Sequence, residues 1–145
     1  MRRIILISIL FFTQQLFAKN ISEPDDLIIL RAIANVETNN QYWKIGRNHE
    51  KTKYQFIEST WYQYSDIPFF FIEQYHYQQE ADRVALTHLD NIKRFLIARN
   101  QYSISNVGWI WNAGFGAYKK GRLPKSTKNY IRKLNKEYQK LNAQK

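Results

Sequence analysis

The chain lacks several residue types on which common kinds of functional site depend. It contains no cysteine, which excludes disulfide bonds, a lipid-modified N-terminal cysteine and cysteine-based metal sites. None of the three histidines, His49, His76 and His88, is spaced i, i+4 from another, so we expect no bound metal and interpret them as surface or loop residues. With only five glycines, the chain has no Gly-rich phosphate loop and no Gly-x-Ser-x-Gly nucleophile turn. The sequence therefore predicts no cofactor.

The chain also has no long apolar run, and its longest apolar stretch lies near the amino end. Arg2-Arg3 precede the apolar stretch Ile4–Phe12, and Leu16–Ala18 is a plausible cleavage site. The stretch is shorter than the roughly 20 residues that a spanning helix needs. We therefore expect a signal peptide over residues 1–18 and one exported domain over residues 19–145, in the periplasm or cell envelope. An uncleaved membrane anchor is the alternative.

Acidic residues are scarce beside basic ones. The chain has 22 Lys and Arg against 12 Asp and Glu, a net charge of +10. Without Arg2 and Arg3, twenty basic residues still face twelve acidic ones. Such a charge favours anionic partners. We do not expect nucleic acid, because the signal peptide indicates export and no interleaved aromatic-basic motif is present.

Helical periods dominate the rest of the chain. Ser22 is a candidate N-cap, and no strand-period run exceeds a few residues. A mainly α single domain with little or no β-structure follows. The expected helices cover residues 25–37, 57–64, 80–100 and 105–112, with a last one from about 126, and residues 113–116 break the fourth. The aromatic residues expected to build the core are Phe56, Trp61, Phe69, Phe70, Phe71, Trp109 and Trp111.

Glu37 closes the apolar stripe of the first expected helix. Leu30, Ile33, Ala34 and Glu37 follow the spacing i, i+3, i+4 and i+7, so the carboxyl should project from the face that packs inward. Burial disfavours the charged form of a carboxyl and raises its pKa, which suits a proton donor at neutral pH. A solvated Glu at a fraying helix end is the alternative.

Four motifs then resemble the lytic transglycosylase family, whose lysozyme-like domain cleaves the glycan strands of peptidoglycan. Glu37-Thr38 matches the catalytic Glu-Ser, and Gln55, 18 residues later, matches the Gln of Gly-x-x-Gln. The segment Ile110–Gly114 is similar to Ala-x-Asn-x-Gly, and Thr127–Ile131 is similar to the Tyr-Val segment of the following helix. Each motif is weak alone, but their common order and spacing are more specific.

The resemblance implies that Glu37 is the general acid and then the base in a reaction without water. It would cleave the MurNAc-GlcNAc β-1,4 bond and leave a 1,6-anhydroMurNAc end. It also implies substrate-binding roles for Thr38, Tyr54, Gln55, Asn112 and Tyr130, with amides holding sugar groups and Tyr130 orienting Glu37. The implied partners are peptidoglycan glycan strands, and an envelope-spanning assembly is compatible with them.

Three residues depart from the family pattern. Thr38 replaces Ser but keeps the hydroxyl, and Ile110 replaces Ala. Thr52 replaces the Gly of Gly-x-x-Gln, and a β-branched residue would be strained if this position needs a positive φ. A non-catalytic basic protein that binds peptidoglycan or assists assembly is one alternative function that these changes leave open.

The other alternative is a hydrolytic lysozyme. Hydrolysis normally uses a second carboxylate as nucleophile or as base for water. Glu58, three residues after Gln55, and Asp66 are the candidates considered for this second carboxylate. A carboxylate near the start of a helix, as expected for Glu58, commonly interacts only with the helix dipole.

Overall fold

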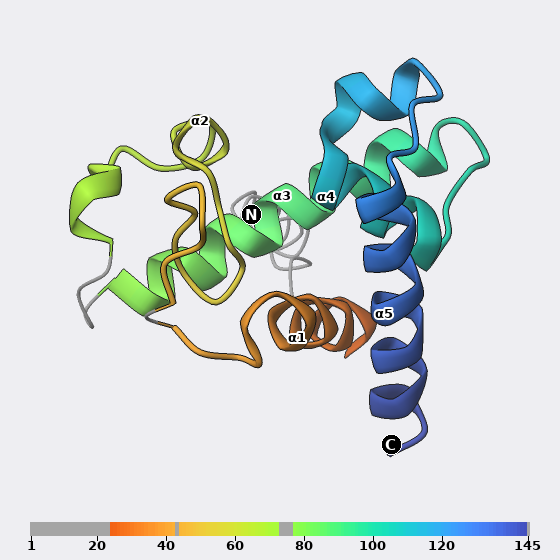
Figure 1. Cartoon of the computed structure of the whole chain (residues 1–145), viewed down its shortest axis with the longest axis horizontal. Helices are drawn as coiled ribbons and strands as arrows, with labels where there is room; N and C mark the ends of the chain where they lie inside the picture. Colours follow the sequence, from red (N-terminus) through yellow and green to blue (C-terminus); the bar gives the residue numbers. More distant parts are fainter. Residues whose placement is uncertain (1–23, 43, 73–76, 145) are drawn as a thin grey trace, which may run out of the picture.

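Helix α1 (Pro24–Thr38) packs against both α3 (Gln78–Ile97) and α5 (Lys125–Asn142), and α4 (Ile104–Lys119) packs on α3 and α5. In Figure 1 α5 runs across the end of α1, whereas α3 extends from one side of the molecule to the other. The computed structural model describes residues 24–42, 44–72 and 77–144. The expected signal peptide, the candidate cap Ser22 and His76 lie outside these residues.

The predicted helical periods explain the core. Each helix contributes an apolar face from which water is excluded, and this burial is the main stabilising contribution in a chain without disulfides. Asp26 in the first turn of α1 also pairs with Lys93 of α3 at 2.5 Å, with both side chains mostly buried. The side chains that are completely inaccessible to solvent include Ile29, Ile33, Trp61, Val84, Leu89, Ile92, Leu96, Val107 and Leu134.

Helix α4 differs from the expected one. It begins where Ser103 accepts a hydrogen bond from the Asn106 N–H, as an N-cap does. The expected end at residues 113–116 is wrong, because the helix continues to Lys119 after a kink at Gly114. Gly114 has φ 81° and ψ 162°, a conformation open to glycine and not to residues with a Cβ. The glycine therefore redirects the helix without ending it.

The segment between α1 and α3 has little regular structure. It contains α2 (Glu58–Trp61), the 3₁₀ turn η1 (Phe69–Phe71) and an isolated antiparallel bridge between Lys51 and Phe56. The described residues contain no strand, so the prediction of a mainly α domain is confirmed. Within the same residues, no helix combines the length and apolarity needed to cross a membrane.

The aromatic core was predicted in part. Phe56, Trp61 and Phe69 are buried, and Trp111 is partly buried against the core. The prediction is wrong for Phe70 and Phe71, which are 78% and 44% exposed at one end of the molecule. Three consecutive aromatic residues on a single 3₁₀ turn cannot all face inward, because their side chains point in different directions.

Candidate functional site

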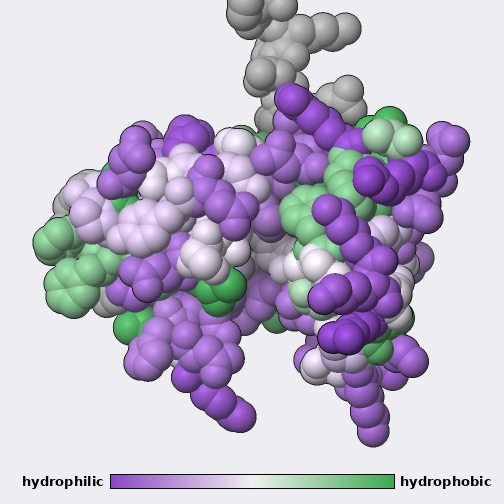
Figure 2. Space-filling view, turned by 90° about the horizontal axis from the view of Figure 1, so that it is seen from above, coloured by the Kyte–Doolittle hydropathy of each residue, from purple (hydrophilic) through white to green (hydrophobic). Residues whose placement is uncertain are grey.

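A cleft of about 400 Å³ opens between the segment after α1 and helix α4. The space-filling view shows the surface hollowed between the two sides of the molecule (Figure 2). The residues that line the cleft are Glu37, Glu50, Tyr54, Gln55, Phe56, Ile57, Thr60, Gln63, His88, Ile110, Trp111, Asn112, Ala113, Gly114 and Phe115. Glu37, Tyr54, Gln55 and Asn112, which were predicted from the sequence, are therefore brought together.

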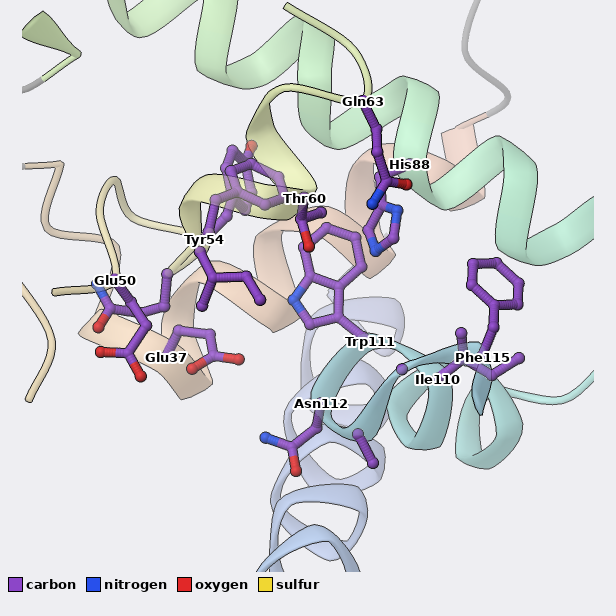
Figure 3. Close-up of a pocket in the computed structure, with 15 residues that line it drawn as sticks. Glu37, Glu50, Tyr54, Thr60, Gln63, His88, Ile110, Trp111, Asn112 and Phe115 are labelled. Carbon is purple, nitrogen blue, oxygen red and sulfur yellow. The ribbon is translucent and has the colours of Figure 1, made fainter. Parts of the chain in front are cut away.

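Glu37 is a half-buried carboxyl at the end of α1. Burial raises its pKa to about 7; the Tyr130 hydroxyl opposes this shift, and the negative charge of Glu50 adds to it. A large fraction of Glu37 is therefore protonated at neutral pH, as a general acid requires. In Figure 3 its carboxyl points into the cleft, with Glu50 on one side and Asn112 on the other.

Glu50 is a site residue that the sequence analysis missed. Burial alone would raise its pKa, but hydrogen bonds from its own backbone and from Asn48 outweigh that effect, so the pKa is lowered. The Asn48 backbone N–H donates to Glu50 Oε2 at 2.8 Å, and Asn48 Nδ2 donates to Oε1 at 2.9 Å. A Cβ at Gly46 would lie 2.2 Å from Glu50 Oε2, so a larger residue there would displace the carboxylate from this position.

The two carboxylates considered from the sequence lie elsewhere. Glu58 and Asp66 are both exposed, and neither lines the cleft. Glu58 is in the first turn of α2, where a carboxylate interacts favourably with the helix dipole. Neither candidate is therefore a second carboxylate in the cleft, as was expected for Glu58, and the second carboxylate that lines the cleft is Glu50.

Tyr130 of α5 lies behind Glu37 and does not itself line the cleft. Its hydroxyl is buried, and burial and the neighbouring Glu37 raise its pKa. The hydroxyl is close enough to lower the pKa of Glu37, but no hydrogen bond of regular geometry joins it to any group in the described part of the chain. Tyr130 therefore contacts the acid and not the open cleft.

Tyr54 and Gln55 are fixed by different contacts. The Tyr54 hydroxyl donates to Asp82 Oδ1 at 2.8 Å, so its ring and not its hydroxyl faces the cleft. Gln55 Nε2 donates to the carbonyls of Lys44 (2.8 Å) and Thr52 (3.0 Å). Because both amide hydrogens have these partners, the Gln55 oxygen is the atom left to accept a hydrogen bond from a ligand.

Asn112 presents the opposite end of its amide. Thr127 Oγ1 of α5 donates to Asn112 Oδ1 at 2.8 Å. In Figure 3 the amide nitrogen of Asn112 points toward the side of the cleft that holds Glu37. Asn112 thus offers donors beside the acid, whereas Gln55 offers an acceptor.

Thr38 has a structural role. It is buried and does not line the cleft. Its hydroxyl lies 3.2 Å from the Ala34 carbonyl and 3.1 Å from the Lys53 carbonyl, and it accepts from the Gln41 N–H at 3.1 Å. The predicted contact of Thr38 with substrate finds no support in this position, because these contacts join α1 to the segment that carries Gln55.

The backbone at Thr52 does adopt the positive φ that was considered from the sequence. Thr52 has φ 69°, and His49 and Gln55 have φ 63° and 53°. The left-handed region is unfavourable for any residue with a Cβ and most of all for a β-branched one. Thr52 Oγ1 compensates in part by accepting from the Tyr54 N–H at 3.2 Å. The segment therefore keeps a glycine-like conformation without the glycine.

His88 contradicts the prediction that it is a surface or loop residue. It lies in α3, is buried among aromatic rings and lines the cleft, and its ring centroid is 5.0 Å from that of Trp111. Burial lowers its pKa to about 4, so the ring is neutral at neutral pH. His49 is exposed, as predicted. No three His, Asp or Glu side chains among the described residues are grouped as metal ligands.

Comparison with models of known protein families, with curated proteins and with solved structures finds no match to this chain.

Proposed function

We propose that this protein is an exported peptidoglycan lytic transglycosylase that cleaves the MurNAc-GlcNAc β-1,4 bond, with Glu37 as general acid and then general base. The observation that carries the proposal is the environment of Glu37. Its carboxyl faces a cleft between two polar amides, with a pKa raised to about 7 by burial. The order of the four sequence motifs supports the same substrate class.

The reaction needs one proton and one nucleophile. Protonated Glu37 gives its proton to the glycosidic oxygen as the bond to the anomeric carbon breaks, which leaves an oxocarbenium-like sugar. The 6-hydroxyl of the same sugar then attacks the anomeric carbon, and ionised Glu37 takes the hydroxyl proton. Glu37 is restored, no water is consumed, and the product has a 1,6-anhydro ring.

The remaining cleft residues suit an N-acetylated sugar. The Asn112 amide can donate to a carbonyl or hydroxyl, and the Gln55 oxygen can accept from an amide N–H or a hydroxyl. The indole of Trp111 lines the cleft beside them. The basic charge of the chain favours an anionic polymer such as peptidoglycan.

Glu37→Gln tests the proposal, because it keeps the shape of the side chain and removes the transferable proton. We expect the variant to remain folded and to lose at least about 100-fold in the rate of glycan cleavage, the lower end of what a general acid contributes. Glu58→Gln, which alters an exposed carboxylate outside the cleft, is the matched control and should keep full activity. Undiminished cleavage by Glu37→Gln would overturn the assignment.

Hydrolysis is the second candidate, and Glu50 is the observation that favours it. A protonated Glu37 and an ionised Glu50 line one cleft, and carboxyl groups held in opposite protonation states are the arrangement of a hydrolytic acid-base pair. Mass spectrometry of the products separates the reactions. Anhydro ends, lighter by one water, indicate transglycosylation, whereas reducing ends indicate a lysozyme.

A further inference from the structure

A second pocket, of about 390 Å³, lies between the C-terminal end of α3 and helix α4. The described residues that line it are Phe95, Arg99, Gln101, Trp109, Tyr118 and Lys119, none of which is acidic. The Phe95 ring of this pocket packs 5.1 Å from the ring of Phe115, which lines the cleft. We call it the basic pocket.

Two cations converge on one ring in the basic pocket. The Arg99 guanidinium lies 3.8 Å from the centroid of the Phe95 ring, and Lys119 Nζ lies 5.6 Å from it. Arg99 Nη1 donates to the Phe95 carbonyl at 3.1 Å, which leaves most of its N–H groups for other partners. Both side chains are positively charged and line the same pocket, so together they would attract an anionic group there.

The polar groups around these cations are arranged as donors. Tyr118 donates its hydroxyl to Gln101 Oε1 at 3.0 Å, so the Gln101 amide turns its NH₂ group toward other partners. Trp109 Nε1 donates to the Arg122 carbonyl at 3.2 Å, so the indole contributes an apolar wall. A planar group with two acceptor oxygens and no donor matches this lining, and Arg in particular binds carboxylates through paired hydrogen bonds.

We propose that the basic pocket is a carboxylate-binding site and that its ligand is the peptide stem of peptidoglycan. The choice of ligand rests on the proposed function, since a glycan strand in the cleft carries stems with free carboxylates close to it. Arg99 and Lys119 would bind the carboxylate, the Gln101 amide would donate to it, and Trp109 would pack on the aliphatic part of the stem.

Titration of the protein with a soluble stem peptide, followed by NMR of the Trp109 indole N–H, tests the site without any cleavage. We expect the peptide with free carboxylates to shift this signal and the fully amidated peptide to have little effect. Arg99→Gln combined with Lys119→Gln should weaken binding at least about tenfold. Both side chains are exposed, so the variant should fold.

The matched control is Lys133→Gln combined with Lys136→Gln, which removes the same charge from the exposed side of α5. Equal weakening in both double variants, or equal binding of the amidated peptide, would overturn the proposal. Vesicles of phosphatidylglycerol test whether the pocket binds the headgroups of anionic lipids instead. If the Arg99 and Lys119 variant loses binding to vesicles and not to the stem peptide, the assignment to the stem is wrong.

A second measurement separates this proposal from the proposed function. The Glu37→Gln protein is sedimented with intact peptidoglycan and with peptidoglycan whose stems an amidase has removed. We expect the Arg99 and Lys119 changes to weaken binding only to the intact wall. Equal weakening on both walls overturns the stem assignment even if cleavage is established. If the protein binds the wall in a stem-dependent way but cleaves no glycan, the assignment of the basic pocket stands and the proposed enzymatic function is overturned.

Discussion

Glu50 lies close enough to Glu37 for its negative charge to raise the pKa of the Glu37 carboxyl. The pKa values of the two side chains are shifted in opposite directions. Burial raises the pKa of Glu37 to about 7, whereas Glu50 accepts two hydrogen bonds from Asn48 and has a lowered pKa. The cleft therefore holds one neutral and one charged carboxyl group over a wide range of pH.

The first prediction concerns the pH dependence of cleavage. Because the proposed reaction needs protonated Glu37 as the donor, kcat/KM should fall as the pH rises through about 7. In Glu50→Gln the loss of a neighbouring negative charge should lower the pKa of Glu37 and move this alkaline limb to lower pH. Rates measured from pH 4 to 9 check both points, with Glu58→Gln as control. If the alkaline limb of Glu50→Gln stays in place or moves to higher pH, the charge of Glu50 does not raise the pKa of Glu37.

The second prediction concerns the stability of Glu37→Gln. Folding raises the pKa of Glu37 from 4.5 to about 7, so between these values the folded state binds more protons and loses stability as the pH rises. The loss is complete above the folded pKa and amounts to about 3 kcal/mol at most, at 1.36 kcal/mol per pKa unit. Glu37→Gln removes this penalty. Urea unfolding should show a gain relative to the parent at pH 8 that is absent at pH 4; the same difference at both pH values would refute it.

The third prediction concerns His88, whose titration changes stability with pH in the opposite direction from that of Glu37. Folding lowers the pKa of His88 from 6.5 to about 4, so the unfolded state binds more protons between these values and stability is lost as the pH falls. The full loss, below the folded pKa, is about 3 kcal/mol. His88→Phe keeps a ring among the rings of Phe56, Trp111 and Phe115 and should flatten the dependence.

The effect of His88 is best measured in the Glu37→Gln background, because Glu37 titrates over an overlapping range with the opposite effect on stability. Unfolding free energies measured at pH 7.5 and 4.5 give the slope of stability against pH. The control is His49→Asn, a change at an exposed position whose φ of 63° asparagine tolerates. A slope that His88→Phe leaves unchanged would show that His88 is not the group responsible.

The fourth prediction concerns the backbone at Thr52. Thr52→Gly and Thr52→Ala both remove the hydroxyl that accepts from the Tyr54 N–H, but only glycine adopts φ 69° without strain. The glycine variant should therefore be more stable than the alanine variant by about 1 kcal/mol, the lower end of the cost of a left-handed residue. Denaturant unfolding of the pair measures the difference. Equal stabilities would mean that this backbone is not strained.

Residues on helices were predicted best, because a period of 3.6 residues reveals which of them face inward. The stripe that placed Glu37 against the core is one case. The same rule would have found His88, which lies four residues after Val84 and four before Ile92 in α3. Its residue type was given more weight than its position, and the prediction was therefore wrong.

Glu50 could not be found in this way. It lies in a segment with no period, and its place in the cleft depends on the tight turn around Gly46 and on the hydrogen bonds from Asn48. Asn112 was matched by motif, but the orientation of its amide is set by Thr127, a residue from another helix. Contacts between distant segments decide such details, and a pattern in one segment does not contain them.

The segment that carries Gln55 is tied down at two places. Thr38 holds it to α1 through the Lys53 carbonyl, and Asp82 of α3 accepts from Tyr42 and Tyr54 at 2.8 Å each and pairs with Lys53 at 2.9 Å. Its conformational entropy is therefore lost when the protein folds and not when a ligand binds. In the proposed reaction, preorganisation of this kind would leave more of the binding free energy for distorting the sugar ring toward its transition state.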